Sequence, residues 1–149
     1  MSSAPIHQEQ LGHLLLRAHR LFAERALARL HAHGHASLRM AHVTLLPHID
    51  AEGTRSSALG ERAGITKQAA GQIIADLEEA GYVRRVHETS DARAQRVLFT
   101  RKGHELVKDA MKIKAEIDAE FVGRIGTKGL TQLRRLLVEL IEEDVPRRR

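Results

Sequence analysis

The segment from Leu59 to Gly103 limits the possible fold more than any other part of the chain. Its first helix is expected to end at Gly64 and its second to begin at Thr66, so about three residues join the two helices. Residues 83–87 and 95–100 are rich in β-forming side chains and lie on either side of a polar turn. This order predicts two short helices closed by a β-hairpin.

The helices before this segment are predicted from the spacing of apolar residues. Residues 8–32 carry an apolar stripe broad enough to contact two partners. A second helix is expected over residues 38–49, with Ser37 as its N-cap. Pro47 lacks a backbone donor, so it should kink or shorten that helix.

The other helix boundaries are predicted from capping residues. Ser56 or Ser57 is expected to cap the first helix of the pair described above. Thr100 is expected to cap a long helix that Gly126 interrupts, and a last helix is predicted over residues 127–144. The fold class is therefore mainly α (α+β), with long helices at both ends of the chain.

The helix that begins at Thr66 has the chemistry of a DNA-reading helix. An α-helix fits the major groove of B-DNA, and residues in its first turns reach the base edges. Gln68 and Gln72 carry paired donor and acceptor groups suited to adenine, and Lys67 can contact guanine or a phosphate. Acidic residues gather at the other end of the helix, where phosphates would repel them, so only its N-terminal half should enter the groove. The residues predicted to face DNA from this helix are Thr66, Lys67, Gln68, Gly71 and Gln72.

The hairpin is expected to act as a wing that makes a second DNA contact. Between residues 84 and 102, six Arg and Lys residues face only two acidic ones. With the tip placed at residues 89–93, Arg93 is suited to insertion into a narrow, negative minor groove. Asp91 is expected to pair with Arg93 or Arg96 and so to orient the wing. The contacts predicted outside the reading helix are Ser57, Asp91, Arg93 and Arg96.

Composition excludes several other classes of protein. The 149 residues, enough for one domain, include no cysteine, which excludes disulfides and thiolate metal sites. An aromatic content of 3%, without Trp, argues against stacking on RNA or single strands. The net charge of +5 favours polyanionic partners.

No apolar run is long enough to span a bilayer and no secretion signal is recognised, so a cytoplasmic protein without membrane contact is expected. The chain also lacks a phosphate-cradling glycine motif and a nucleophile elbow, so neither an enzyme nor a cofactor is expected.

Four motifs together resemble the MarR (multiple antibiotic resistance regulator) family of winged helix-turn-helix proteins. They are Leu59–Thr66, Leu77–Arg85, Asp91–Arg93 and Phe99–Gly103. The resemblance extends over nearly the whole chain, because the long flanking helices match the family's layout. It implies a homodimeric transcriptional regulator of double-stranded DNA, usually a repressor that a small ligand releases from a pseudo-palindromic operator. It also places residues 66–72 on the groove-reading helix, and Asp91 and Arg93 on the wing.

The flanking helices are predicted to form the dimer. Residues 1–35 and 101–149 are assigned to a helical dimerisation region and residues 36–100 to the DNA-binding region, within one structural domain. The flanking helices carry more apolar surface than one small domain needs, and a dimer would read two half-sites about one helical turn apart. The residues assigned to dimerisation are Leu11, Leu14, Leu15, Leu133, Leu136, Leu137, Leu140 and Ile141.

Eight of the ten His residues lie in the first 48 positions. His31, His33 and His35 alternate as in a metal-binding tract, which leaves a metal-responsive regulator as one alternative. A helix end that contains glycine gives them no fixed geometry, so no metal site is assigned. The family's ligand cavity would lie between the dimer helices and the reading head and could hold a small aromatic acid. The residues expected to line it are His13, Arg17, His42, His48 and Met111, although a structural role is favoured for each His taken alone.

A second alternative is a protein-interaction adaptor that keeps the winged fold without reading DNA. Such an adaptor would bind DNA weakly, with strong salt dependence and no preferred site. A regulator would retain a large specificity ratio in salt.

Overall fold

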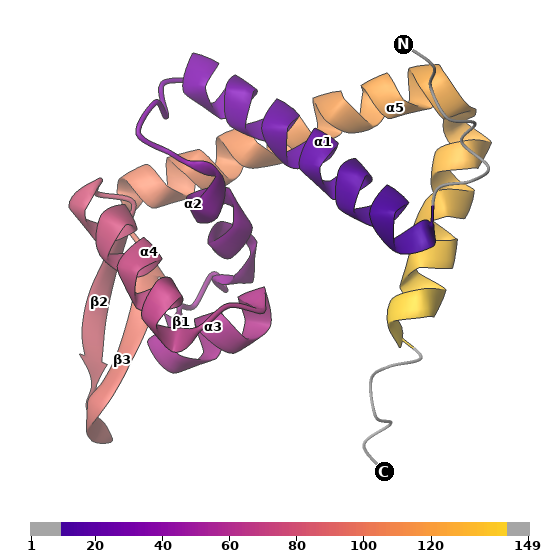
Figure 1. Cartoon of the computed structure of the whole chain (residues 1–149). Helices are drawn as coiled ribbons and strands as arrows, with labels where there is room; N and C mark the ends of the chain where they lie inside the picture. Colours follow the sequence, from indigo (N-terminus) through magenta and orange to yellow (C-terminus); the bar gives the residue numbers. More distant parts are fainter. Residues whose placement is uncertain (1–9, 143–149) are drawn as a thin grey trace. The chain divides into compact units, whose positions relative to one another are not determined.

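A computed structural model describes residues 10–142, except the side chains of residues 91 and 92. The chain divides into two compact units, residues 1–113 and residues 114–149. The expected mainly helical, winged helix-turn-helix fold is confirmed (Figure 1). None of the helices described is long and apolar enough to cross a membrane. In chain order the elements are α1 (Leu11–Ala32), α2 (Met40–Leu45), the 3-10 helix η2 (Leu46–His48), β1 (Thr54–Arg55), α3 (Ser56–Ala63), α4 (Lys67–Glu79), β2 (Val83–Glu88), β3 (Asp91–Phe99) and α5 (Arg101–Glu142).

The α3–α4 pair forms as predicted because its boundaries are encoded locally. Gly64 ends α3 with a φ of 67°, a left-handed conformation that glycine adopts without steric cost. The Thr66 hydroxyl then accepts a hydrogen bond from the backbone N–H of Ala69 at 3.1 Å and so caps α4. Leu59 of α3 and Leu77 of α4 are fully buried. The inner face of the pair is thereby fixed, and its outer face is left to solvent.

The starts of α2 and α3 differ from the prediction. Leu38 precedes α2 and is buried, while Ser37 does not cap the helix, which begins at Met40. The cap comes instead from His42, whose Nδ1 accepts a hydrogen bond from the Arg39 N–H at 2.9 Å. At α3 no side chain caps the helix, and the Ser56 hydroxyl donates to the Gln95 carbonyl of β3 at 3.0 Å.

Pro47 shortens its helix as predicted. The α-helical conformation ends at Leu45, and Pro47 lies in the first turn of the 3-10 helix that follows. Residues 51–53 form a turn, which closes with a hydrogen bond from the Gly53 N–H to the Asp50 carbonyl at 2.9 Å. The turn leads into β1, a two-residue strand that the sequence pattern did not reveal.

The sheet has three antiparallel strands in the order β1-β3-β2. Thr54 of β1 pairs with Val97, and Val83 of β2 pairs with Phe99. The predicted position of the wing tip is wrong: only Thr89 and Ser90 form the turn, and Asp91 already belongs to β3. An irregularity in the register between His87 and Glu88 accommodates extra residues in β3, which extends that strand toward the turn. Arg93 therefore lies on a strand near the tip.

The last helix begins and breaks where the sequence indicated. The Thr100 hydroxyl accepts a hydrogen bond from the Gly103 N–H at 3.1 Å and so caps α5. Gly126 has φ 77° and ψ 163°, which lie outside the helical region and divide α5 into two helical segments.

Hydrogen bonds among His35, Tyr82 and Asp109 link three segments of the first unit. His35 Nδ1 lies 2.9 Å from the hydroxyl of Tyr82, and His35 Nε2 lies 3.0 Å from Oδ2 of Asp109 on α5. His35 and Tyr82 are both buried. The hydrogen bond from His35 lowers the pKa of Asp109. The three side chains tie the loop after α1 to the start of β2 and to α5.

Candidate nucleic-acid interface

The outer face of α4 has the exposure expected of a reading helix. Lys67, Gln68 and Gln72 are exposed, whereas Ala70 and Ile74 are buried against the rest of the unit. A Cβ atom added at Gly71 would meet no other atom within 4 Å, so this part of the helix is open to the approach of a large partner. The N-terminus of α4 has no acidic residue in its first turn, which leaves its positive dipole end uncompensated there.

The C-terminal half of α4 carries acidic groups that are used within the protein. Glu78 Oε2 accepts a hydrogen bond from the backbone N–H of Arg85 at 3.2 Å, and its Oε1 lies 3.7 Å from Nε of the same residue. This contact joins the end of α4 to β2. The expected polarity of the helix, neutral or basic at the start and acidic at the end, therefore also has a structural role.

Asp76 is the centre of a group of contacts that sequence reasoning missed. Its Oδ1 accepts a hydrogen bond from Nε2 of Gln72 at 3.0 Å, and its Oδ2 accepts one from Arg39 at 2.6 Å. His42 Nε2 lies 3.6 Å from the same Oδ2. The hydrogen bond from Gln72 is the main cause of the lowered pKa of Asp76. The spacing of four residues between Gln72 and Asp76 was the only signal of this contact in the sequence.

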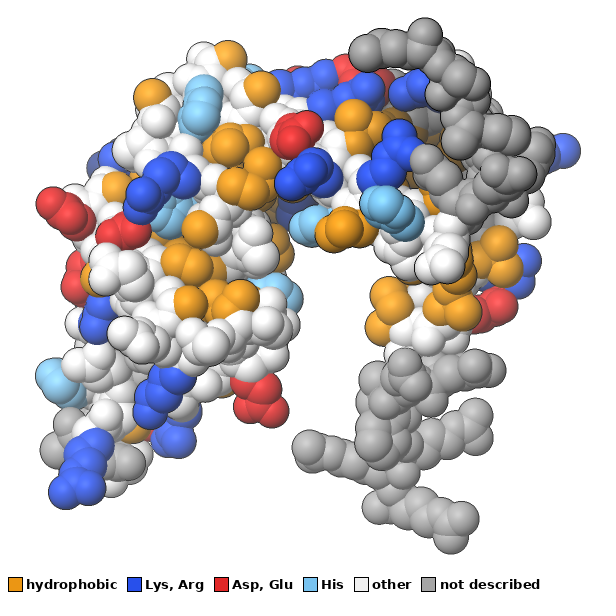
Figure 2. Space-filling view, viewed as in Figure 1, with side chains coloured by type: hydrophobic (Ala, Val, Ile, Leu, Met, Phe, Trp, Pro, Cys, Tyr) orange, Lys and Arg blue, Asp and Glu red, His pale blue; other side chains and the backbone are white. Residues whose placement is uncertain are grey.

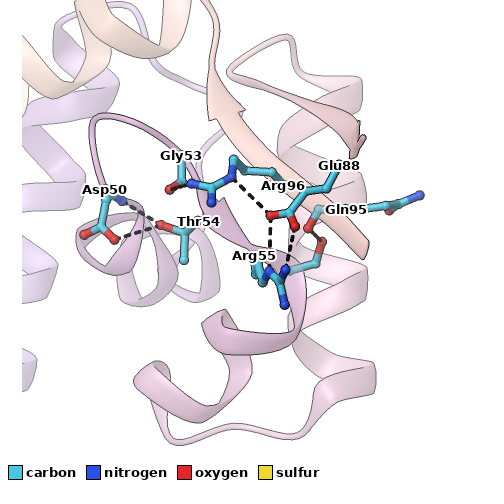
Figure 3. A network of polar contacts seen from close by, with 8 residues as sticks. Asp50, Gly53, Thr54, Arg55, Glu88, Gln95 and Arg96 are labelled. Atoms are coloured by element: carbon cyan, nitrogen blue, oxygen red, sulfur yellow. Dashed lines mark hydrogen bonds and ion pairs between the residues drawn. The ribbon is translucent and has the colours of Figure 1, made fainter. Parts of the chain in front are cut away.

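Two arginines converge on Glu88, the last residue of β2 (Figure 3). Arg55 of β1 makes a bidentate contact with Glu88, at 3.1 Å from Nε to Oε1 and 2.6 Å from Nη2 to Oε2. Arg96 of β3 lies 3.4 Å from Glu88 Oε1 and donates to the Gly53 carbonyl at 2.9 Å. The hydrogen bond from Arg55 lowers the pKa of Glu88. One carboxylate, next to the turn of the hairpin, thus connects all three strands.

The wing residues predicted to contact DNA have different surroundings. Arg93 and Ser57 are exposed. Arg96 is half-buried and contacts Glu88 and the Gly53 carbonyl. The Asp91 side chain lies outside the described residues, and its predicted pairing with Arg93 or Arg96 stays a prediction. Basic side chains lie over the lower end of the β2–β3 hairpin in Figure 2.

The residues predicted to line a ligand cavity have no common environment. His13, Arg17 and Met111 are exposed, and His48 is partly buried in the 3-10 helix. His42 is buried, and its contacts with the start of α2 and with Asp76 give it a structural role. A cavity of about 450 Å³ lies elsewhere, on the wing beside its turn, and its lining includes none of these residues. Their role in ligand binding remains a prediction.

The histidine tract has a structural use at two of its three positions. His31 Nε2 lies 2.7 Å from the Leu38 carbonyl, and His35 belongs to the buried group with Tyr82 and Asp109. Within residues 10–142, side chains 91 and 92 excepted, no three His, Asp or Glu side chains are grouped so that they could hold a metal ion. The structure therefore adds no support to a metal-responsive regulator.

Two short helices joined by a tight turn, together with a three-stranded sheet that includes the hairpin after them, define a winged helix-turn-helix protein. A family model described as "MarR family" matches residues 36–94. The winged helix-turn-helix segment of the chain is therefore similar to this family.

Comparison with known proteins gives relatives that are named as transcriptional regulators rather than as enzymes. The chain is 34% identical over 79 residues to the transcriptional regulator HosA of Escherichia coli O157:H7, a match that covers 53% of this chain and 58% of HosA. It is 30% identical over 88 residues to the HTH-type transcriptional repressor Rv2887 of Mycobacterium tuberculosis, covering 59% of this chain and 63% of Rv2887. The matches thus span less than two thirds of the length of these curated relatives.

Solved structures of similar proteins cover most of the chain. The crystal structure of the transcriptional regulator PA4135 has a TM-score of 0.76 at 26% identity, and the match covers 93% of this chain and 100% of that one. A crystal structure of Rv2887, described as a complex with salicylic acid, has a TM-score of 0.67 at 27% identity over 89% of this chain and 97% of that one.

Proposed function

We propose that this protein is a homodimeric regulator of transcription that binds specific double-stranded DNA sequences through α4 and the wing, and that it acts as a repressor. The observation that carries the proposal is the exposed start of α4, where Lys67, Gln68 and Gln72 project from a helix whose opposite face is buried. This face suits the major groove, and the basic hairpin beside it suits the phosphates and the minor groove. We propose a cytoplasmic location, because the protein must reach the DNA that it regulates.

Exposed apolar side chains support the dimer in this proposal. On α1, Leu11 and Leu15 are 60% and 41% exposed, and Leu14 is partly buried. In the second unit Leu133, Leu136, Leu140 and Ile141 are exposed and Leu137 is partly buried. A helix that leaves large aliphatic side chains in water gains stability when a second copy covers them. The assignment of residues 1–35 and 101–149 to dimerisation, with residues 36–100 reading DNA, belongs to the same proposal.

A small aromatic acid is the ligand class that we propose for the release of DNA. The support is the relative Rv2887, whose structure is described as a complex with salicylic acid. A ligand can release DNA by favouring a dimer in which the two reading helices no longer match both half-sites. The test is a titration of the protein–DNA complex with salicylate, which should weaken DNA binding, whereas benzyl alcohol, which lacks the carboxylate, should not.

DNA reading is tested by comparing two variants on a preferred duplex and on random duplex DNA. Arg93→Ala should weaken both complexes by a similar factor, because a contact to the backbone or groove shape acts on every sequence alike. Gln72→Ala should weaken mainly the preferred complex, by about fivefold or more, because it removes a base contact. Equal losses on both DNAs for both variants would contradict this division of roles. Weak binding by the unaltered protein to every sequence alike, abolished by salt, would favour the adaptor instead.

A further inference from the structure

The amide of Gln72 is held in one of its two orientations. Its Nε2 donates to Oδ1 of Asp76 at 3.0 Å. An ionised carboxylate can only accept hydrogen bonds, so the amide must turn its NH2 group toward Asp76 and its Oε1 away from it. The pKa of Asp76 is lowered, first by this hydrogen bond and further by its contacts with His42 and Arg39, so the carboxylate is ionised at neutral pH.

Asp76 is itself held by residues at the start of α2. Arg39, which precedes α2, donates to Asp76 Oδ2 at 2.6 Å. His42 Nε2 faces the same oxygen at 3.6 Å from a buried position. Because His42 Nδ1 accepts a hydrogen bond from the Arg39 N–H, neutral His42 carries its proton on Nε2, toward Asp76. Oδ2 of Asp76 is therefore contacted by Arg39 and His42, and Oδ1 accepts the hydrogen bond from Gln72.

A fixed amide reads DNA differently from a free one. Every base pair offers hydrogen-bond donors and acceptors in the major groove in an order that reverses when the pair is inverted. A glutamine that can rotate its amide by half a turn can match either order. A glutamine whose NH2 end is held presents only one order, and so it can distinguish a base pair from its inverse.

We propose that Asp76 determines specificity: by holding the amide of Gln72, it makes this position of the DNA site sensitive to the direction of a single base pair. This inference rests on the proposed function, since it requires α4 to read the major groove. Asp76 is a positioning residue in this account and need not contact DNA.

The test measures the preference for one base pair over its inverse. A preferred duplex is first selected from random DNA with the unaltered protein, and each position of the site is then inverted in turn in binding measurements. The position read by Gln72 is the one at which Gln72→Ala loses its preference. The unaltered protein should prefer one direction there by about tenfold or more. Asp76→Ala should reduce that preference to about threefold or less and keep the preferences at the other positions.

A second Asp76 variant and a control variant distinguish the loss of Gln72 positioning from unfolding and from a change in net charge. In Asp76→Asn, Arg39 should retain the amide oxygen, so the new NH2 group faces Gln72 and turns its amide around. The preference should then disappear or reverse. Glu79→Ala removes one negative charge from an exposed position of the same helix and should leave every base preference unchanged. Thermal unfolding followed by circular dichroism verifies that the variants fold.

The outcomes separate this inference from the proposed function. In one outcome the unaltered protein selects a DNA site, but the base pair read by Gln72 keeps its full directional preference in both Asp76 variants. That result would leave the proposed function intact and overturn the inference. An equal loss of preference at all positions in Asp76→Ala would also overturn it, because that pattern indicates a displaced helix. Failure of the unaltered protein to select any site would overturn the proposed function, and the inference with it.

Discussion

At the scale of single residues, Gly103 shows how closely the start of α5 approaches the hairpin. A Cβ atom at this position would lie 2.1 Å from the Tyr82 carbonyl oxygen and 2.9 Å from Cδ1 of Phe99. Gly103→Ala should therefore lower the free energy of unfolding by about 1–3 kcal/mol, as measured by urea denaturation, because backbone must shift to admit the methyl group. Gly123→Ala is the matched control, since its Cβ would meet nothing within 4 Å, and it should raise stability by up to about 1 kcal/mol. Similar changes in both variants would contradict this account.

Single residues were predictable where the cause of their conformation is local. The cap at Thr66 and the breaks at Gly64 and Gly126 follow from side chains and backbone preferences within a few residues. The capping role of His42 was not predicted, because capping preferences favour Ser37 and give no weight to histidine. The exposed face of α4 was predicted correctly, but the orientation of the Gln72 amide depends on Asp76 and on Arg39, a residue 37 positions away from Asp76.

At the scale of the elements, Glu88 joins the wing to the rest of the sheet. Glu88→Gln should remove the charge that both Arg55 and Arg96 contact, so β3 should open more often. Hydrogen exchange of the amides near Arg96 should become faster by about threefold or more in this variant. Glu105→Gln removes an exposed carboxylate from a surface pair with Arg101 and should leave exchange in β3 unchanged. Unchanged exchange in Glu88→Gln would show that the pairing of β3 does not depend on this carboxylate.

The elements themselves followed from periodicity and turn residues, except where they are short or held by distant partners. The two residues of β1 carry no period of their own, and only pairing with β3 makes them a strand. The tip of the hairpin was placed too broadly, because the register irregularity beside Glu88 depends on strand pairing. The shortened α2 was predictable because Pro47 acts through its own backbone.

At the scale of the whole molecule, four carboxylates link stability to acid pH. The pKa of each is below its ordinary value, mainly because of a hydrogen bond from one partner: Asp50 from Arg62, Asp76 from Gln72, Glu88 from Arg55 and Asp109 from His35. A lowered folded pKa means that the stabilisation is fully present above the ordinary values, 3.8 for Asp and 4.5 for Glu, and is lost as pH falls through the folded values. The free energy of unfolding in urea should therefore decrease from about pH 5 to pH 3. A constant or rising free energy over this range would contradict the assignment.

The proposed dimer predicts that a charge at the end of α5 will separate the protomers. Leu140 is 53% exposed in the single chain, so Leu140→Glu should leave the fold of one protomer intact while placing a charge in the interface. Sedimentation should then give a monomer, and affinity for DNA should fall by at least about tenfold. Gln132→Glu adds the same charge at an exposed position outside the predicted set and should remain a dimer. A Leu140→Glu protein that sediments as the unaltered one does would remove Leu140 from the interface.

The central claim, that two copies of the winged unit read DNA together, is tested most directly by selecting binding sites from random duplex DNA. The account predicts an inverted repeat whose half-sites have centres about one helical turn, roughly 10 base pairs, apart. Enrichment of a single half-site without a repeat would contradict the two-fold arrangement, and the absence of any enriched sequence would contradict specific DNA reading itself.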